Sequence, residues 1–361
     1  MKIGLFGFPQ VGKTTLFNLL TGAHVETPRF SSGRTDPNLG IARVPDPRLA
    51  RLSGMFTPKK TTPATFEYVD IVGLQKGDAK GSLALTVLKP MDALAHVVRA
   101  FADDAIAHSE GALDPARDVE TMEMELILAD LDAAQRRIER LKTSIPKTNR
   151  PEEKKELAVL EKVREQLEAG HPLRGIEPAA GDEKILRGFA FYSAKPLLVL
   201  VNVGENDAAH VDAAAERFGL KAAAARPRVT VAAASGKIEE EMAALSEEDA
   251  ASFRTELSIR EPALHRILHA SYDLLGLIVF YTVGEDECRA WPIHRGVTAA
   301  RAAGTIHSDL EKGFIRAEVV RYEDLVSCGS LQAAKEKGQL RLEGKEYVVA
   351  DGDVMHIRSG L

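Results

Sequence analysis

The sequence has few cysteines, few aromatic residues, no excess of positive charge and no long apolar run. Cys288 and Cys328 are its only cysteines, too few for a disulfide framework and not at metal-ligand spacing, so a reducing, cytoplasmic setting is expected. A formal net charge of −6 excludes a global field that attracts nucleic acid or anionic lipid, and leaves only local patches for such partners. No apolar run approaches the roughly 18 residues that span a bilayer. Gly7 and Pro9 interrupt the apolar N-terminal stretch, which therefore does not resemble a signal peptide, and no membrane partner is expected.

The length and the overall composition are those of an ordinary globular protein. At roughly 100 to 200 residues per domain, 361 residues suggest two or three domains. The 45% of hydrophobic residues exclude a mainly disordered or collagen-like chain and are enough for a sizeable core without disulfide or metal support.

The first part of the chain alternates buried strands with helical segments. Residues 2–6 read as a short strand that turns through a glycine-containing loop into a helix over 14–20. Further apolar runs bounded by polar or turn residues predict buried strands at 65–72, 93–99, 196–201 and 228–233. This alternation predicts a parallel, doubly wound sheet.

A helical hairpin is predicted between the strands at 93–99 and 196–201. From Met124 to Leu141 the apolar residues recur at three-four spacing, and a second such stripe runs over 157–167. The polar segment 144–151 contains two prolines and is expected to break the helix. The two helices then form an antiparallel hairpin inserted into the α/β domain. Its tip, 147–150, is either a partner-binding site or simply a solvated face.

The last 85 or so residues, by count along the sequence, predict a compact α+β module of β-grasp size. Expected strands lie at 277–283, 287–292, 315–320 and 347–349, with a helix at 299–312. Arg289, Trp291, His294 and Arg295 lie close together and form either a small RNA-facing patch or a buried tryptophan with a solvated basic rim. His307 and His356 have no evident metal or triad partners and are interpreted as structural.

The strongest motif is a phosphate-binding loop between the first strand and the first helix. Gly7 to Thr14 reads GFPQVGKT, which fits the G-x-x-x-x-G-K-T pattern. Its glycines let backbone N–H groups converge on phosphate oxygens, and the helix N-terminus adds a favourable dipole. Lys13 is expected to reach the β and γ phosphates and the Thr14 hydroxyl to ligate Mg²⁺. The motif predicts nucleotide binding.

A second motif, Asp70-Ile71-Val72-Gly73, ends the predicted strand 65–72. An Asp at this place can hold Mg²⁺, usually through water, and the Gly73 N–H can sense the γ phosphate. Leu74 follows, where a Ras-like protein carries the glutamine that positions water, and Gln75 is one residue too far along. We therefore expect slow intrinsic hydrolysis.

Two further segments are expected to meet the base. Asn202-Val203-Gly204-Glu205 follows a buried strand, at the place where GTPases carry N-K-x-D, whose Asp accepts from guanine. With Glu205 for Asp and Val203 for Lys, discrimination against ATP should weaken or reverse. Ser235-Gly236-Lys237 follows the next strand and is a weaker indication of the last base-contacting loop. The predicted nucleotide-binding residues are Gly7, Phe8, Pro9, Gln10, Val11, Gly12, Lys13, Thr14, Thr15, Asn202, Val203, Glu205, Ser235 and Gly236.

Together these motifs resemble the Obg-like ATPase (YchF) family of P-loop NTPases. The resemblance also rests on TDPNLG, DVETMEMELILADL, SGKIEEE, IHSDLEKGFIRAEVV and DGDV and covers nearly the whole chain. It implies a Ras-like nucleotide domain, an inserted coiled-coil hairpin and a C-terminal TGS domain. It further implies Mg²⁺-dependent hydrolysis of ATP in preference to GTP, and association with the ribosome, its large subunit in particular, or with RNA.

Three positions depart from the family pattern. Gln10 stands where the family loop usually has an asparagine linked to a stimulating monovalent cation, so K⁺ dependence is not carried over to this chain. Arg34 occupies the place of the family's switch threonine, so either Thr35 ligates Mg²⁺ from one position along or that ligand is absent. The segment between Gly77 and Pro90 is shorter than the family's.

These observations combine into one expected architecture and two possible functions. A nucleotide domain is expected over 1–108 and 182–273, the hairpin over 109–181 and a TGS-like domain over 274–361. Lys13, Thr14, Asp70 and Gly73 are the expected catalytic residues, with Thr14, Thr35 and Asp70 as metal ligands and ATP or GTP as substrate. The alternative function is a ribosome- or RNA-binding module with a vestigial nucleotide site.

Overall fold

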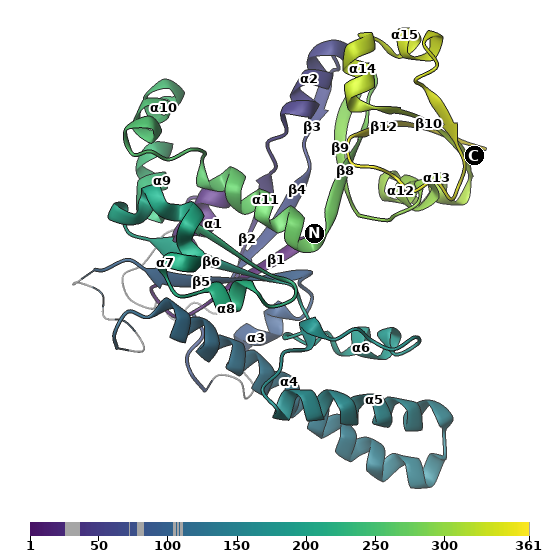
Figure 1. Cartoon of the computed structure of the whole chain (residues 1–361). Coiled ribbons are helices and arrows are strands. Elements are labelled where there is room, and N and C mark those ends of the chain that lie inside the picture. The colour runs from purple at the N-terminus through teal and green to yellow at the C-terminus, as the bar shows by residue number, and fades with distance from the viewer. Residues whose placement is uncertain are drawn as a thin grey trace. The chain divides into compact units, whose positions relative to one another are not determined.

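The computed structural model of the chain consists of two compact units (Figure 1). It describes residues 1–25, 37–71, 73–77, 83–103, 106, 108 and 111–360. The first unit comprises Met1–Ala42 and Glu67–Leu274, and the second comprises Arg43–Phe66 and Leu275–Leu361. Arg43–Phe66 thus groups with the C-terminal residues and not with the nucleotide domain to which the sequence analysis assigned it. The boundaries expected at 108, 181 and 273 stay predictions.

A six-stranded sheet forms the centre of the first unit. Its order is β2-β4-β1-β5-β6-β7, and β4, β1, β5, β6 and β7 pair in parallel. The bounds are β1 Lys2–Phe6, β2 Asn38–Arg43, β4 Thr65–Asp70, β5 Ala93–Ala100, β6 Leu197–Val203 and β7 Val229–Ala234. Every residue of β5 and β6 is buried, as expected of central parallel strands covered on both faces. The predicted α/β class is confirmed; β2, an edge strand of mixed burial, was not predicted.

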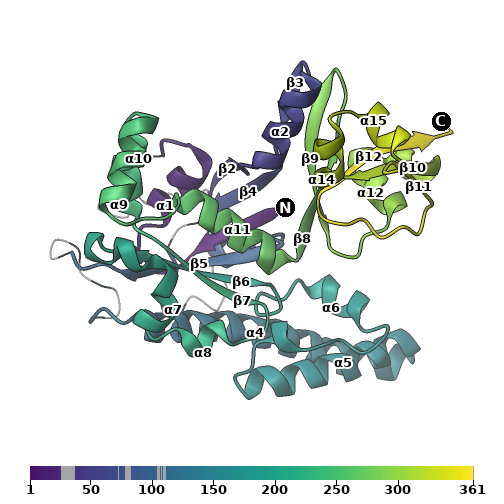
Figure 2. The same cartoon turned by 45° about the horizontal axis from the view of Figure 1, so that its top comes forward.

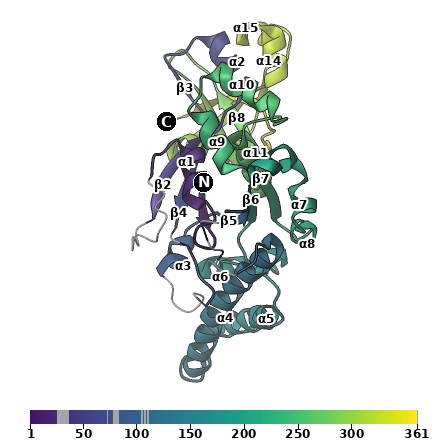
Figure 3. The same ribbon diagram turned by 90° about the vertical axis from the view of Figure 1, so that its left-hand side faces the viewer.

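Helices cover both faces of this sheet. Figure 3 shows α1 and α11 on one side and α4 on the other. The bounds are α1 Lys13–Thr21, α3 Leu83–Leu88, α6 Glu183–Phe189, α7 Ala214–Arg217, α8 Lys221–Ala224, α9 Gly236–Ala243, α10 Glu247–Glu256 and α11 Ala263–Leu275, with 3₁₀ helices at Leu173–Gly175 and Glu205–Ala213. None of the helices in the described part of the chain is both long and apolar enough to cross a membrane.

The predicted helical hairpin is formed by α4 (Pro115–Thr148) and α5 (Pro151–Glu168) (Figure 2). Apolar side chains from both helices pack into one cluster that includes Ile138 and Leu160. The helix break predicted over 144–151 is wrong in its extent, because α4 continues through Pro146 to Thr148, with Asn149 as its C-cap. Asn149 adopts φ 51° and donates its N–H to the Ile145 carbonyl 2.9 Å away, a left-handed cap. A proline in the last turn costs the helix only one backbone hydrogen bond.

The second unit is the predicted α+β module, extended by an earlier segment. Its sheet order is β11-β10-β12-β8-β9-β3, in which β8 pairs antiparallel with β9 and parallel with β12. The strands are β3 Lys60–Thr62, β8 Leu277–Thr282, β9 Glu287–His294, β10 Phe314–Arg321, β11 Arg341–Glu343 and β12 Asp353–Ser359; the helices are α2 Pro47–Phe56, α12 Ala299–Ile306, α13 Ser308–Lys312, α14 Tyr322–Cys328 and α15 Leu331–Glu336.

Polar contacts hold the early segment to this unit. The Tyr281 hydroxyl donates to the Asp46 carboxylate, and Arg48 donates to Asp351 Oδ2 at 2.7 Å. In addition, β3 pairs in parallel with β9. The sequence analysis missed α2 and β3, since their partners lie more than 200 residues away along the chain.

Two predictions for this unit are corrected by the structure. Residues 347–349 form only an isolated bridge from Val348 to Thr298, and the strand lies later, at β12. The predicted helix 299–312 is two helices, because His307 is extended at φ −160° and ψ 140°. Its Nδ1 accepts from the Asp309 N–H at 3.3 Å and so caps α13, a structural role as expected.

Candidate functional site

The phosphate-loop motif connects β1 to α1 as predicted. Gly12 has φ 88°, and a Cβ atom there would lie 2.2 Å from Asn202 Nδ2, so both backbone conformation and space require glycine. Phe8 and Val11 are buried, whereas Gln10 is exposed and has φ 60°. The loop therefore exposes its backbone to solvent, while the apolar side chains of Phe8 and Val11 face the protein interior.

Lys13 is turned back onto its own loop. Its Nζ donates to the Phe8 carbonyl at 2.7 Å and to the Gly7 carbonyl at 3.3 Å. Burial lowers the pKa of Lys13 to about 8, and the nearby Asp70 carboxylate opposes this shift. An incoming phosphate would replace neutral carbonyls with a charged partner for a poorly solvated ammonium group.

Asp70 ends β4 directly opposite the start of α1. Its Oδ2 accepts from Thr14 Oγ1 at 2.9 Å and from Asn38 Nδ2 at 3.1 Å. Its Oδ1 is buried and has no hydrogen-bond partner among the described residues. Burial raises the pKa of Asp70, while the hydrogen bonds from Thr14 and Asn38 and the charge of Lys13 lower it. Asn38, which the motif analysis gave no role, belongs to this group.

The Asp70 group fits a small divalent cation. Asp70 Oδ1, buried and unpartnered among the described residues, and the Thr14 hydroxyl bonded to the same carboxylate are hard oxygen donors of the kind that Mg²⁺ prefers. The described residues contain no cluster of three or more His, Cys, Asp and Glu side chains that could hold a metal by themselves. The remaining ligands of such an ion would be water and phosphate. Thr35, the third predicted ligand, and Arg34 lie outside the described residues.

Gly73 and Leu74 lie against the phosphate loop. A Cβ atom on Gly73 would be 2.8 Å from the backbone of Pro9, so only glycine allows this approach. The Leu74 N–H donates to the Gly7 carbonyl at 3.0 Å and its side chain is buried, whereas Gln75 is exposed. The residue after Gly73 is thus a buried leucine, and Gln75 does not take its place.

Asn202 connects the two ends of the predicted site. Its Nδ2 donates to the Val11 carbonyl at 3.1 Å and its Oδ1 accepts from the Gly236 N–H at 3.0 Å. One buried side chain thereby ties the phosphate loop to the loop that follows β7. A Cβ atom on Gly236 would lie 3.2 Å from Thr15 Cγ2, so Thr15 borders the same place.

The other predicted base-contacting residues differ in exposure. Glu205 is exposed and forms an ion pair with Lys237. Val203 is buried at the end of β6. Ser235 is buried as well, and its hydroxyl has no hydrogen-bond partner in the part of the chain that the structure describes.

His96, on β5, is a buried residue that the motif analysis missed. Its ring stacks on Phe6 with centroids 4.9 Å apart, next to the start of the phosphate loop. Burial, with a smaller contribution from the charge of Lys13, lowers the pKa of His96 to about 3, so the ring is neutral at physiological pH. The signal in the sequence is a histidine within the otherwise apolar stretch 93–98.

Two family models match the chain. The model described as 50S ribosome-binding GTPase matches residues 2–162. The model YchF-GTPase_C, described as a protein of unknown function, matches residues 277–360. The first match contains the phosphate loop and α4, and the second contains the strands of the C-terminal module.

Curated relatives match over the full length. The ribosome-binding ATPase YchF of Bacillus subtilis is 43% identical, with 99% of each chain covered. The protein of the same name from Escherichia coli O157:H7 is 41% identical, with 98% of each chain covered. Among solved structures, the YchF GTPase of Schizosaccharomyces pombe is 32% identical and matches with a TM-score of 0.84, over 99% of this chain and 97% of that one. The chain belongs to the YchF family of P-loop proteins.

Proposed function

We propose that this chain is a Mg²⁺-dependent P-loop NTPase that acts as a nucleotide-controlled switch, prefers ATP to GTP and associates with the ribosome. The observation that carries the proposal is the Asp70 carboxylate, which accepts from Thr14 and whose buried Oδ1 has no hydrogen-bond partner among the residues that the structure describes. A structural carboxylate would gain stability by pairing that oxygen. A metal-holding carboxylate needs it free.

Each residue of the site receives a role in this proposal. The backbone N–H groups of the loop 7–12 and the Lys13 ammonium bind the phosphates. Thr14 and Asp70, with Thr35 from the first switch segment, hold Mg²⁺, which when bound neutralises charge on the phosphate oxygens. The Gly73 N–H faces the γ phosphate and orders the segment that follows it.

The preference for ATP is supported by the pair of Glu205 and Lys237. Guanine is recognised in GTPases by a carboxylate that accepts from its N–H donors. Here the corresponding carboxylate is engaged by a lysine ammonium, and guanine would have to displace it. Asn202, Val203, Ser235 and Gly236 are proposed to line the base site beside it.

Slow turnover is proposed on account of Leu74. Its apolar side chain is buried after Gly73 and can neither donate to nor accept from an attacking water. Orientation of that water must come from another group, which lowers the rate of the unassisted reaction. Stimulation by a partner then becomes the natural means of control.

The proposed partner is the ribosome, in the cytoplasm. The curated relatives are named ribosome-binding ATPases, and one matching family model is described as a 50S ribosome-binding GTPase, which favours the large subunit. With a net charge of −6, binding must use local patches. Trp291 is a poor candidate for stacking on bases, because it is buried and Arg289 lies over its ring at 3.9 Å.

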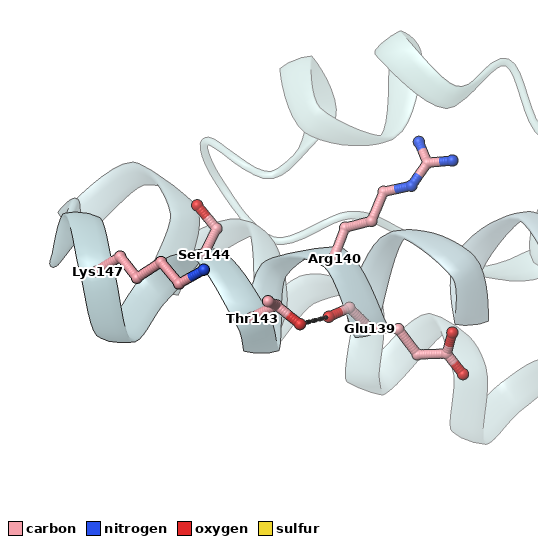
Figure 4. A pocket seen from close by; sticks show the side chains of 5 residues that line it. All are labelled: Glu139, Arg140, Thr143, Ser144 and Lys147. Carbon is pink, nitrogen blue, oxygen red and sulfur yellow. Dashed lines mark hydrogen bonds between the residues drawn. The ribbon is translucent and has the colours of Figure 1, made fainter.

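The far half of α4 is a better local patch. It bears a shallow hollow of about 490 Å³ lined by Glu139, Arg140, Thr143, Ser144 and Lys147 (Figure 4). Neither Arg140 nor Lys147 has a carboxylate within ion-pair distance in the described part of the chain, and both are exposed. The hollow is lined by two cations and two hydroxyls against the one carboxylate of Glu139, and this excess of positive charge suits the phosphate backbone of RNA.

Parallel measurement of ATP and GTP affinity tests the proposed specificity. With Mg²⁺ present, ATP is expected to bind more tightly than GTP. A tenfold preference for GTP, about 1.4 kcal/mol, would contradict the proposed specificity.

The variant Lys13→Ala distinguishes a nucleotide-controlled switch from a binding module with a vestigial site. A switch loses nucleotide-dependent ribosome association in this variant. A vestigial module binds ribosomes unchanged, with or without nucleotide.

A further inference from the structure

The base of α4 carries buried carboxylates on two opposite sides. On one side Glu123 accepts from Arg174 Nη1 at 2.7 Å, and Asp130 accepts from the Ser193 N–H at 2.7 Å. Glu125 is two residues from Glu123, about 200° around the helix, and so points the other way. There its Oε1 accepts from the Gly77 N–H at 2.9 Å. The inserted hairpin therefore contacts the segment that follows Gly73.

That segment is held at both ends. Near its start the Leu74 N–H bonds to the Gly7 carbonyl of the phosphate loop, and at Gly77 the N–H bonds to Glu125. Only Gln75 and Lys76 lie between the two anchors. Gly77 has φ 96°, a conformation that favours glycine, although nothing lies within 4 Å of where a Cβ atom would be. The backbone conformation of Gly77, and not a lack of space, sets the direction of its N–H.

We propose that Glu125 is a positioning residue for the nucleotide reaction, which holds segment 73–77 in place over the phosphate loop and links its position to the hairpin. The proposal rests on the proposed NTPase function, because the position of Gly73 matters only when a γ phosphate is bound. A hydrogen bond from an N–H to a buried carboxylate is stronger than one between neutral groups. It is therefore suited to fix the end of a short segment in which Gln75, Lys76 and Gly77 are exposed.

The linkage to the hairpin follows from the shortness of the segment. A γ phosphate that draws the Gly73 N–H toward itself pulls on segment 73–77. This segment is anchored four residues later, where the Gly77 N–H bonds to Glu125. Glu123 and Asp130 hold α4 to the body of the unit on its other side. Movement at Gly73 that releases the Leu74 N–H from the Gly7 carbonyl must then either break the Glu125 bond or act on α4. The hydrogen bond from the Gly77 N–H to Glu125 thus links the position of the hairpin to the nucleotide state.

Three variants of the full-length chain test this role. Glu125→Ala removes the acceptor, Glu125→Gln keeps an oxygen of similar reach, and Asp132→Asn is the control, a carboxylate on the same helix whose ion-pair partner, Arg136, also lies on that helix. For each, ATP turnover, ADP affinity and amide hydrogen exchange over 73–77 are measured. Glu125→Ala is expected to lower kcat about tenfold, equivalent to about 1.4 kcal/mol, with little change in ADP affinity. Its Gly77 amide should exchange at least about tenfold faster than in the wild type.

The two other variants separate positioning from general destabilisation. Glu125→Gln should retain most of the turnover, and Asp132→Asn should leave both turnover and Gly77 exchange close to the wild type. Equal turnover in Glu125→Ala and the wild type, or an equal loss in Asp132→Asn, would overturn the proposal. If the wild type does not hydrolyse ATP, the proposed function fails, while exchange at Gly77 still decides whether Glu125 holds the segment. If Glu125→Ala does not fold, an unprotected Gly77 amide in the wild type overturns the proposal by itself.

Discussion

The Thr14 hydroxyl lies 2.9 Å from Asp70 Oδ2 and donates a hydrogen bond to it. This bond joins the first turn of α1 to the last residue of β4, two elements that are adjacent in space only because β1 and β4 pair in parallel. The Thr–Asp pair brings two hard oxygens to the mouth of the phosphate loop. The account of the protein as a Mg²⁺-dependent NTPase depends on this pair more than on any other contact.

Gly12→Ala should disrupt the site through Asn202. The new Cβ atom would meet Asn202 Nδ2 at 2.2 Å, and alanine at φ 88° is strained by about 1–2 kcal/mol. We expect ATP affinity to fall at least about tenfold and the free energy of unfolding to drop. Titration with a fluorescent ATP analogue and urea unfolding measure the two effects.

Gly54→Ala is the control for that change. Gly54 lies within α2, and nothing lies within 4 Å of where its Cβ atom would be. Alanine there should stabilise the fold by about 0.5–1 kcal/mol, because it favours the helical conformation. Unaltered ATP affinity in Gly12→Ala would show that the Asn202 contact does not shape the site.

His96 should make the fold sensitive to acid. Its folded-state pKa of about 3 lies below the unfolded value of 6.5, so between these values the unfolded chain binds more protons. Stability is therefore lost as the pH falls below about 6.5. From pH 7.5 to pH 5 we expect this histidine to cost about 2 kcal/mol of unfolding free energy. His96→Leu should lose less stability than the wild type over this range in urea titrations; identical losses would refute the assignment.

Lys237→Met should narrow the preference for ATP. The substitution frees the Glu205 carboxylate from its ion pair, so that it becomes available to accept from guanine. Both side chains are exposed, and exposed ion pairs are weak, so the ratio of GTP to ATP dissociation constants should fall by only a few-fold. Arg217→Met, which removes an ion pair with Asp207 nearby, is the control and should leave the ratio unchanged. An unchanged ratio of dissociation constants in Lys237→Met would show that Glu205 does not determine the choice between guanine and adenine.

The basic face of α4 should contribute to ribosome association. Arg140→Glu combined with Lys147→Glu reverses two exposed charges at the hollow shown in Figure 4, neither of which forms an ion pair with another described residue. Weaker co-sedimentation with ribosomes is expected, with a smaller dependence on salt concentration, because fewer counterions are released on binding. The same double change at Lys142 and Lys162 is the control, since Lys142 already pairs with Glu161. ATP turnover without ribosomes should be the same in both.

Much of the site could be predicted from sequence, because the motifs follow strands in the order in which a parallel sheet brings them together. Lys13, Thr14 and Asp70 fall side by side for this reason. The contacts of Asn38, His96 and Glu125 could not be predicted, since each depends on a partner far along the chain and none belongs to a local pattern. Similarly, Arg43–Phe66 groups with the C-terminal residues, and its strand β3 pairs with β9. The composition of this segment alone does not indicate that pairing.

The Mg²⁺-dependent ATPase activity of Asp70→Asn is the sharpest test of whether Asp70 holds the metal for nucleotide hydrolysis. Asparagine has nearly the same shape and can still accept from Thr14, but it lacks the charge that would hold the metal. The wild type is expected to hydrolyse ATP with Mg²⁺ and not with excess EDTA, and Asp70→Asn should be about 100-fold slower while its thermal midpoint stays close to that of the wild type. Turnover in Asp70→Asn equal to that of the wild type, or wild-type turnover that persists in EDTA, would contradict the account.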